Sequence, residues 1–242
     1  MAGVAGAARR QSIGEAGRMV GELPRLWLRP HGQPIADPVP WVGAERLERW
    51  LAAPRGLLLL TPHMGSFEMA AQAYVERYGP QRPMTVLYRP ARKAWLRRLE
   101  ETARSRPHLA TAPATLAGVR QLLRALKRGE TVGMLPDQVP PEGMGVWAPF
   151  FGRAAYTMTL AGRLARQAGA EVGILWAERL PRGAGWRVHA EALPEALSEG
   201  GGELADATAI NRSMETVIAR APGQYLWGYH RYKSPRPAAN PS

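Results

Sequence analysis

The stretch GLLLLTPHMGSFE at residues 56–68 decides the fold. Four consecutive leucines bounded by turn-forming residues are typical of a strand that is buried on both faces, as in a parallel sheet. Gly65 permits a tight turn, and Ser66 can cap the helix that we expect to follow. The stretch therefore predicts a strand, a corner and a helix in immediate succession.

The same alternation of strand and helix continues on both sides of this stretch. A long loop at 136–152, a hairpin turn at 182–185 and a short aromatic strand at 225–229 complete the pattern. Short buried strands that alternate with helices favour one α/β domain built on a mostly parallel central sheet flanked by helices. We expect strands at 56–61, 84–88, 131–135, 171–178 and 186–190, and helices at 44–52, 66–78, 91–104, 115–127, 157–167 and 206–219.

An amphipathic helix and a proline-rich connector precede this domain. We place them in residues 1–40, the domain in 41–233 and a disordered tail in 234–242. The helix carries an apolar stripe flanked by arginines, which is typical of a helix in a membrane interface and equally of one packed on its own core. The longest strongly apolar run, at 56–60, is far shorter than the about 20 residues of a spanning helix, so we expect no spanning segment. The stripe consists of Ile13, Ala16, Val20, Leu23 and Trp27.

Composition excludes several functional classes. The 242 residues contain no cysteine, which excludes a disulfide framework, a thiol nucleophile and a thiolate metal site. A net charge of +12 indicates an acidic partner, such as nucleic acid, an anionic membrane, a phosphorylated lipid or an acidic protein, unless it reflects only a composition rich in arginine. No Walker loop, dinucleotide fingerprint or H-E-x-x-H motif is present, so we expect neither nucleotide binding by those routes nor a metal.

The end of the first strand carries the first candidate site. His63 and Glu68 are five positions apart, too far round a single helix to meet, but a strand–turn–helix corner allows the carboxylate to reach back to the imidazole. A carboxylate-held imidazole is a general base. Ser66 lies too close in sequence to be its nucleophile, and no G-x-S-x-G elbow exists, so the base would act directly on a substrate hydroxyl.

Two further strand ends carry polar residues. Arg89 follows the strand at 84–88 and is suited to a phosphate or carboxylate, and Arg92, Lys93, Arg97 and Arg98 follow on a basic helix. Asp137 follows the strand at 131–135. The next loop carries Trp147, Phe150 and Phe151, which form an apolar wall suited to an acyl chain or a membrane, or else a plug over the sheet edge. Ligands bind at the carboxyl ends of strands in such sheets.

Taken together, these segments resemble the lipid A biosynthesis acyltransferases, the lauroyl/myristoyl-transferase branch of the lysophospholipid acyltransferase superfamily. The similarity extends from Gln11 to Lys233. An H-x4-E motif alone is a weak signal, but several motifs in family order at plausible spacing are specific. They are HMGSFE at 63–68, YRP at 88–90, MLPDQ at 134–138, VWAPFFG at 146–152, and Trp227 with RYK at 231–233.

The resemblance implies an enzyme that transfers a fatty acyl group from an acyl carrier protein or coenzyme A thioester to a hydroxyl of a lipid A precursor, without a cofactor. By motif match, His63 is the general base and Glu68 its orienting partner. Arg89 falls on the position linked to the acceptor phosphate, and Asp137 falls on an acid that the family needs near the site. The implied substrate-binding residues are Arg89, Asp137, Gly65, Trp147 and Phe150.

The resemblance also implies a location and partners. They are the cytoplasmic face of the bacterial inner membrane, an acyl carrier protein, a phosphorylated glycolipid and an anionic membrane surface, with no nucleic acid; the net charge of +12 fits them. Relatives usually begin with a spanning helix that this sequence lacks, so we expect peripheral anchoring by residues 12–27 or a truncated start. Lys93-Ala94 stands where relatives often carry Asn-Pro, which leaves the acceptor open.

Three alternatives remain. The first is an acyltransferase that acts on another lysophospholipid or on a glycerol phosphate. The second is a non-enzymatic basic module that binds nucleic acid, for which the aromatic and basic residues at 186–187 and 229–233 are the only indication. The third is a catalytically inactive paralogue, against which the intact His63 and Glu68 argue.

Overall fold

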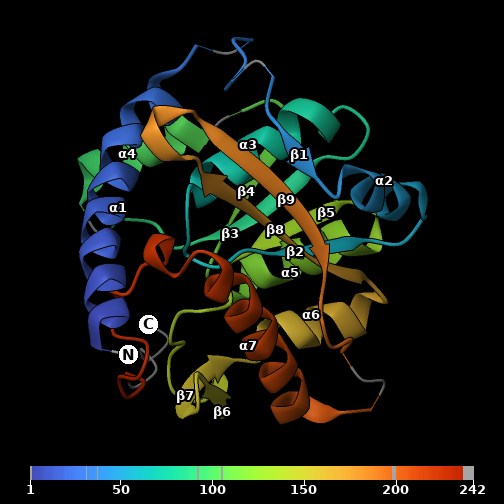
Figure 1. Ribbon diagram of the computed structural model, residues 1–242. Coiled ribbons are helices and arrows are strands. Elements are labelled where there is room, and N and C mark those ends of the chain that lie inside the picture. The colour runs from blue at the N-terminus through green and yellow to red at the C-terminus, as the bar shows by residue number, and fades with distance from the viewer. Residues whose placement is uncertain are drawn as a thin grey trace.

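A seven-stranded sheet forms the centre of the protein (Figure 1). The computed structural model describes residues 2–30, 32–36, 38–91, 93–104, 106–197 and 200–236. The strand order is β1-β9-β8-β2-β5-β3-β4, and all neighbours are parallel except β8 and β9. The strands are β1 (Trp41–Val42), β2 (Leu57–Leu60), β3 (Met84–Tyr88), β4 (Leu109–Pro113), β5 (Thr131–Met134), β8 (Glu171–Arg179) and β9 (Trp186–Ala192).

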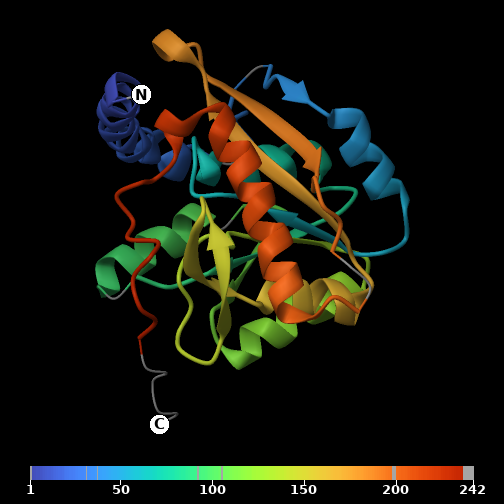
Figure 2. The same ribbon diagram turned by 60° about the horizontal axis from the view of Figure 1, so that its bottom comes forward.

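Helices cover both faces of the sheet, so the predicted α/β fold with a mostly parallel sheet is confirmed (Figures 1 and 2). They are α1 (Ala2–Leu28), α2 (Ala44–Ala52), α3 (Phe67–Tyr78), α4 (Ala94–Arg104), α5 (Leu116–Lys127), α6 (Leu160–Ala168) and α7 (Gly202–Arg220), with short 3-10 turns η1 (Pro181–Gly183) and η2 (Pro222–Gln224).

The four leucines of β2 contribute to two hydrophobic cores, one on each face of the sheet. Leu58 and Leu60 pack with α5, α6 and α7 on one face, whereas Leu57 and Leu59 pack with α2, α3 and the end of α1 on the other. Side chains alternate along a strand, and a strand buried on both faces must therefore be apolar throughout. Gly129, just past the end of α5, has a φ of 80°, the left-handed conformation that favours glycine at a helix end.

A separate hairpin corrects the prediction of a long loop at 136–152. Strands β6 (Gly145–Phe150) and β7 (Arg153–Met158) pair antiparallel, and α6 begins at Leu160 rather than at 157. The turn between β6 and β7 places Phe151 and Gly152 at positive φ, the conformation that tight hairpin turns require. An alanine-rich sequence at 153–155 has low strand propensity, and pairing with β6 overrides it.

Three short segments also differ from the prediction. The edge strands β1 and β4 were not predicted. Residues 225–229 are not a strand: only Tyr225 forms an isolated bridge, to Met64, and turns follow it. Residues 31, 92 and 237–242, which include Arg92 and most of the predicted tail, lie outside the described residues.

Helix α1 lies along one side of the molecule, beside the C-terminal segment (Figures 1 and 2). It continues through Pro24 to Leu28, and the proline-rich connector follows it. Its apolar stripe is divided: Ile13 and Val20 are 68% and 60% exposed, whereas Trp27 packs against the core. Over the described residues, none of the helices combines the length and hydropathy that crossing a membrane would require.

Candidate active site

The pairing of β2 with β5 brings His63 and Asp137 together. Leu60 of β2 lies opposite Met134 of β5, and each polar residue follows three positions later. The Thr61 N–H donates to the Met134 carbonyl at 3.0 Å, which continues the alignment beyond the strands. Both residues therefore sit at the carboxyl edge of the sheet, where ligands bind in such folds.

Asp137 contacts both the side chain and the backbone of His63. Its Oδ1 lies 2.6 Å from the imidazole Nδ1, and its Oδ2 accepts the His63 backbone N–H at 2.9 Å. Asp137 is 2% exposed. A carboxylate at Nδ1 favours the tautomer that carries its proton there, which leaves the lone pair of Nε2 free to accept a proton. This is the arrangement of a general base.

The electrostatics agree with an ionised Asp137. Burial alone would raise the pKa of this carboxyl, but the electrostatic interaction with His63 and the hydrogen bonds from His63 outweigh burial, so the pKa lies below its ordinary value. Burial, together with the charge of Asp137 and a hydrogen bond to it, raises the pKa of the Tyr225 hydroxyl. Tyr225 therefore stays protonated beside the carboxylate.

Gln138 lies at the other imidazole nitrogen. Its side-chain Nε2 is 3.1 Å from Nε2 of His63. An amide N–H is a donor, so it satisfies the lone pair that an incoming hydroxyl would otherwise use. A substrate hydroxyl would have to take the place of this amide to reach the base.

Glu68 lies in the first turn of α3, close in sequence to the corner at Gly65. Since Asp137 occupies Nδ1 of His63, the orienting role of Glu68 stays a prediction. Sequence reasoning placed Asp137 near the site but missed its contact with the imidazole. The signal available was the matched pattern of a buried strand followed by Pro62-His63 and Pro136-Asp137 on two adjacent strands.

The corner between β2 and α3 depends on Gly65. Its φ is +55°, and an added Cβ would lie 2.0 Å from the Ala177 carbonyl oxygen, a distance that no side chain tolerates. The Gly65 N–H donates to the Gln224 carbonyl at 3.0 Å. The predicted cap by Ser66 is wrong: its hydroxyl is buried without a hydrogen bond, and its backbone N–H donates to Ala177 at 2.9 Å.

The basic residues after β3 are accessible. Arg89 is exposed directly after the strand, and within the described residues no hydrogen bond or ion pair holds it. Lys93 and Arg98 are exposed as well, and Arg97 donates to the Ala91 carbonyl at 3.2 Å. Arg89 is thus free to contact an anionic group, and its binding role stays a prediction.

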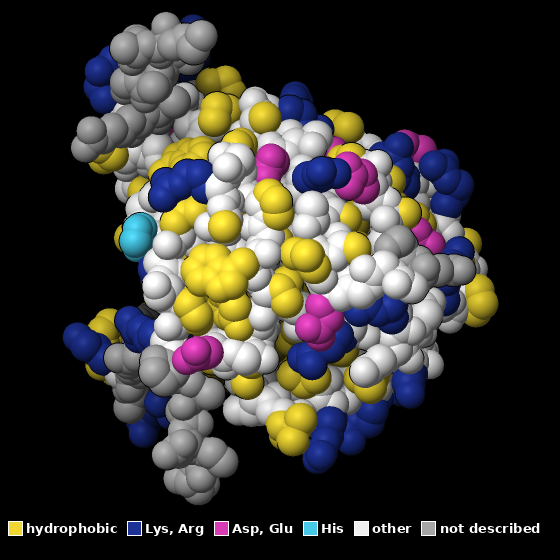
Figure 3. All heavy atoms as spheres, turned by 90° about the horizontal axis from the view of Figure 1, so that it is seen from below, with side chains coloured by type: hydrophobic (Ala, Val, Ile, Leu, Met, Phe, Trp, Pro, Cys, Tyr) yellow, Lys and Arg dark blue, Asp and Glu magenta, His cyan; other side chains and the backbone are white. Residues whose placement is uncertain are grey.

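The aromatic wall is divided between core and surface. Phe150 is 1% exposed and packs with Tyr225 and Tyr232, whereas Trp147 is 50% exposed. Sequence reasoning missed the pairing of Phe151 with Trp227, both exposed, at 5.7 Å between ring centroids. Figure 3 shows the face that carries the hairpin and α7, with hydrophobic side chains gathered near its centre. Contacts of Trp147 and Phe150 with substrate stay predictions.

Among the described residues, no group of three or more His, Asp or Glu side chains is arranged to hold a metal ion. The geometry of the site therefore consists of an imidazole, a buried carboxylate and an amide at adjoining strand ends, with an exposed arginine at the end of β3 and aromatic side chains on the hairpin.

Comparison with known proteins identifies the family. The profile of bacterial lipid A biosynthesis acyltransferases matches residues 7–234. The lipid A biosynthesis lauroyltransferase of Escherichia coli (strain K12) is 30% identical over 223 residues, which cover 91% of this chain and 70% of the relative. The palmitoleoyltransferase of the same strain is 29% identical, over 83% of this chain and 63% of the relative. A Haemophilus influenzae lipid A biosynthesis acyltransferase is 25% identical over 188 residues, 77% of this chain and 57% of the relative.

The motifs that suggested the resemblance lie within the matched range, and His63 lies at the carboxyl edge of the sheet. The chain belongs to the bacterial lipid A biosynthesis acyltransferase family.

Proposed function

We propose that this chain transfers a fatty acyl group from a thioester, carried by acyl carrier protein or coenzyme A, to a hydroxyl of a lipid A precursor. The observation that carries the proposal is the 2.6 Å contact between His63 Nδ1 and Asp137 Oδ1 in a chain of this family. It provides a base at the carboxyl edge of the sheet. A thioester is already reactive, so no enzyme nucleophile is required.

His63 alone can carry the proton from the attacking hydroxyl to the departing thiolate. Nε2 takes the proton of the acceptor hydroxyl as its oxygen attacks the thioester carbonyl carbon. The resulting tetrahedral intermediate collapses, the carbon–sulfur bond breaks, and the imidazolium returns the proton to the departing thiolate. Asp137 stabilises the imidazolium between these two events, because its negative charge lies beside Nδ1.

Glu68 and Asp137 are both candidates for the carboxylate that orients His63. The predicted partner Glu68 follows from the motif, whereas Asp137 is buried and bonded to the ring. We propose Asp137 as the group that orients His63, and we retain Glu68 as a residue required near the reacting atoms. Comparing Glu68→Gln with Asp137→Asn separates the two roles.

Charge and surface pattern support an anionic membrane and an acidic carrier as partners. The outward face of α1 exposes Ile13, Val20 and Leu28, at 68%, 60% and 67%. Arg10, Arg18 and Arg25 are exposed on the same helix. An amphipathic helix with an apolar face and arginines binds membrane surfaces reversibly. We propose a peripheral protein at the cytoplasmic face of the inner membrane.

The decisive experiment combines purified protein, acyl carrier protein loaded with a fatty acid, and a lipid A precursor in detergent. We expect mass spectrometry to detect a product heavier by one acyl group, and His63→Ala to abolish it. Lysophospholipid and glycerol phosphate replace the glycolipid in parallel reactions. Transfer to one of these acceptors alone would overturn the acceptor assignment and keep the reaction class.

A further inference from the structure

Helix α1 packs on the protein through a polar face. Ser12 and Glu15 are buried, and the side chain of Glu22 is 12% exposed. Ser12, Glu15, Met19 and Glu22 follow one another at intervals of three, four and three residues, so they share one side of the helix. Much of this helix is thus held by charge rather than by apolar burial.

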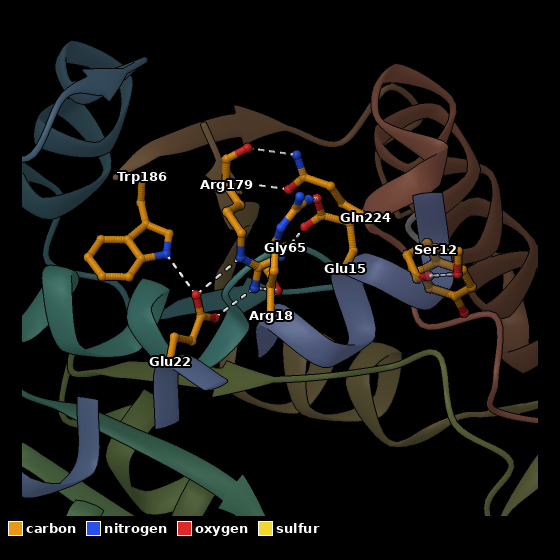
Figure 4. Close-up of polar contacts among 9 residues, drawn as sticks. Ser12, Glu15, Arg18, Glu22, Gly65, Arg179, Trp186 and Gln224 are labelled. Carbon is orange, nitrogen blue, oxygen red and sulfur yellow. Dashed lines mark hydrogen bonds and ion pairs between the residues drawn. The ribbon is translucent and has the colours of Figure 1, made fainter. Parts of the chain in front are cut away.

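The guanidinium of Arg179 donates hydrogen bonds to the carboxylates of both Glu15 and Glu22. Arg179, at the end of β8, places Nη1 2.5 Å from Oε2 of Glu15. Its Nε and Nη2 donate to the two oxygens of Glu22 at 3.1 and 2.7 Å, a bidentate pair, and Trp186 Nε1 donates to Glu22 at 3.1 Å (Figure 4). Burial alone would lower the pKa of Arg179, but the two glutamates outweigh it and raise the pKa.

The same guanidinium reaches the corner that follows His63. Nη2 of Arg179 also donates to the Gly65 carbonyl at 3.1 Å. The Gln224 side chain bonds both the N–H and the carbonyl of Arg179, each at 2.8 Å, while the Gln224 main-chain carbonyl accepts the Gly65 N–H. Both backbone polar groups of Gly65 are therefore bonded to Arg179 or to the residue that Arg179 contacts.

Helix α1 also contacts the segment that holds the other side of His63. Ser12 Oγ donates to the Tyr225 carbonyl at 3.3 Å, and the next residue, Leu226, donates its N–H to the His63 carbonyl at 2.9 Å. The peptide of His63 and that of Gly65 are thus each linked, through one intermediate, to the buried face of α1.

We infer that Arg179 is a positioning residue. It connects the buried face of α1 to the corner at 63–66, so the packing of α1 determines the conformation of this corner and hence the position of the His63 imidazole. The inference rests on the proposed function, because it assigns the consequence of that placement to acyl transfer. The catalytic imidazole must be held closely, since a displacement of about 1 Å can cost about 10²-fold in rate. Arg179 itself touches no reacting atom.

The test compares Arg179→Met and Glu22→Gln with the wild-type chain. We expect kcat to fall about 10- to 100-fold in Arg179→Met, and less in Glu22→Gln, with KM for donor and acceptor within about threefold of wild type because no binding group is removed. Arg212→Met is the matched control, since Arg212 pairs with Glu195 on the surface. That control should leave kcat unchanged.

A spectroscopic measurement separates positioning from general destabilisation. In 15N-labelled protein, the Nδ1 proton of His63 resonates according to its bond with Asp137. We expect this resonance to shift or broaden in Arg179→Met at a temperature where the variant is fully folded, and not in Arg212→Met. Added guanidinium ion should restore part of kcat in Arg179→Ala, because it can bridge the two glutamates and the Gly65 carbonyl.

The activity and the His63 resonance of the Arg179 variants together test the inference. A folded Arg179→Met protein with wild-type kcat and an unchanged His63 resonance would overturn the inference. If Arg179→Met does not fold, Glu22→Gln and Arg179→Lys give the same comparison, and unchanged values in both overturn it. If the wild-type protein transfers no acyl group, the proposed function fails, and the His63 resonance alone still tests whether Arg179 sets the corner.

Discussion

Asp137 binds His63 through both carboxylate oxygens, one at the imidazole and one at the backbone N–H, 2.6 and 2.9 Å away. The first contact fixes the tautomer, and the second fixes the peptide from which the imidazole projects. A single buried side chain that follows β5 thereby determines the orientation of a residue that follows β2. The pairing of the two strands is what makes this possible.

Replacing Asp137 with Asn should reduce kcat by about 10²–10⁴-fold, because the amide no longer stabilises an imidazolium and favours the wrong tautomer. His63→Ala should cost as much, and the double variant little more, since the two residues act as a unit. Steady-state kinetics on acyl carrier protein thioester measure this. If Glu68→Gln reproduces the loss while Asp137→Asn keeps near-normal turnover, Glu68 is the orienting carboxylate.

The lowered pKa of Asp137 also predicts a pH dependence of stability. A carboxyl whose pKa is lower in the folded protein contributes stability above its unfolded pKa, about 3.9, and loses it as pH falls through the folded value. From pH 6 down to about 3, we therefore expect the free energy of unfolding of the wild type to fall more than that of Asp137→Asn. Urea titrations at several pH values measure the difference. Parallel curves would mean that Asp137 is not stabilised in its ionised form.

Gly65→Ala should impair both folding and catalysis. The positive φ of +55° costs about 1–3 kcal/mol for a residue with a Cβ, and the Cβ would also meet the Ala177 oxygen at 2.0 Å. Gly143→Ala is the control, since Gly143 has a φ of +79° with no atom within 4 Å. Thermal unfolding should show a clearly larger loss at Gly65, whereas equal losses would remove the steric argument.

Much of the fold follows from local pattern. Strand β2 was predictable because burial on two faces demands a continuous apolar run. The helices α2, α3 and α5 were predictable as partners in the alternation of strand and helix. The β6–β7 hairpin was not, since its second strand begins Arg153-Ala154-Ala155, a sequence that by itself favours a helix.

The candidate site was predictable in its residues but not in their pairing. His63 and Asp137 lie 74 positions apart, and only the strand order brings them together. The role of Arg179 has no local signal at all, because its partners Glu15 and Glu22 are more than 150 positions away. They also lie about 100° round the helix from the apolar stripe that the sequence shows.

The outward face of α1 provides the last prediction. Ile13, Val20 and Leu28 are at least 60% exposed, so changing all three to Ser removes apolar surface without opening a cavity. We expect weaker binding to vesicles that contain anionic lipid, with an unchanged unfolding temperature and unchanged transfer to detergent-dispersed acceptor. Binding of the wild type should weaken as salt rises, since exposed charges are screened over about 10 Å at 0.1 M.

The matched control is Leu26→Ser on the same helix. Leu26 is fully buried in the core, and its loss leaves a cavity and a buried hydroxyl, which together cost several kcal/mol, about 2–5. Vesicle flotation and thermal unfolding, measured on both variants, then separate surface from core. If the triple variant floats with vesicles as the wild type does, α1 is not the membrane contact, and the exposed aromatic residues Trp147, Phe151 and Trp227 become the next surface to change.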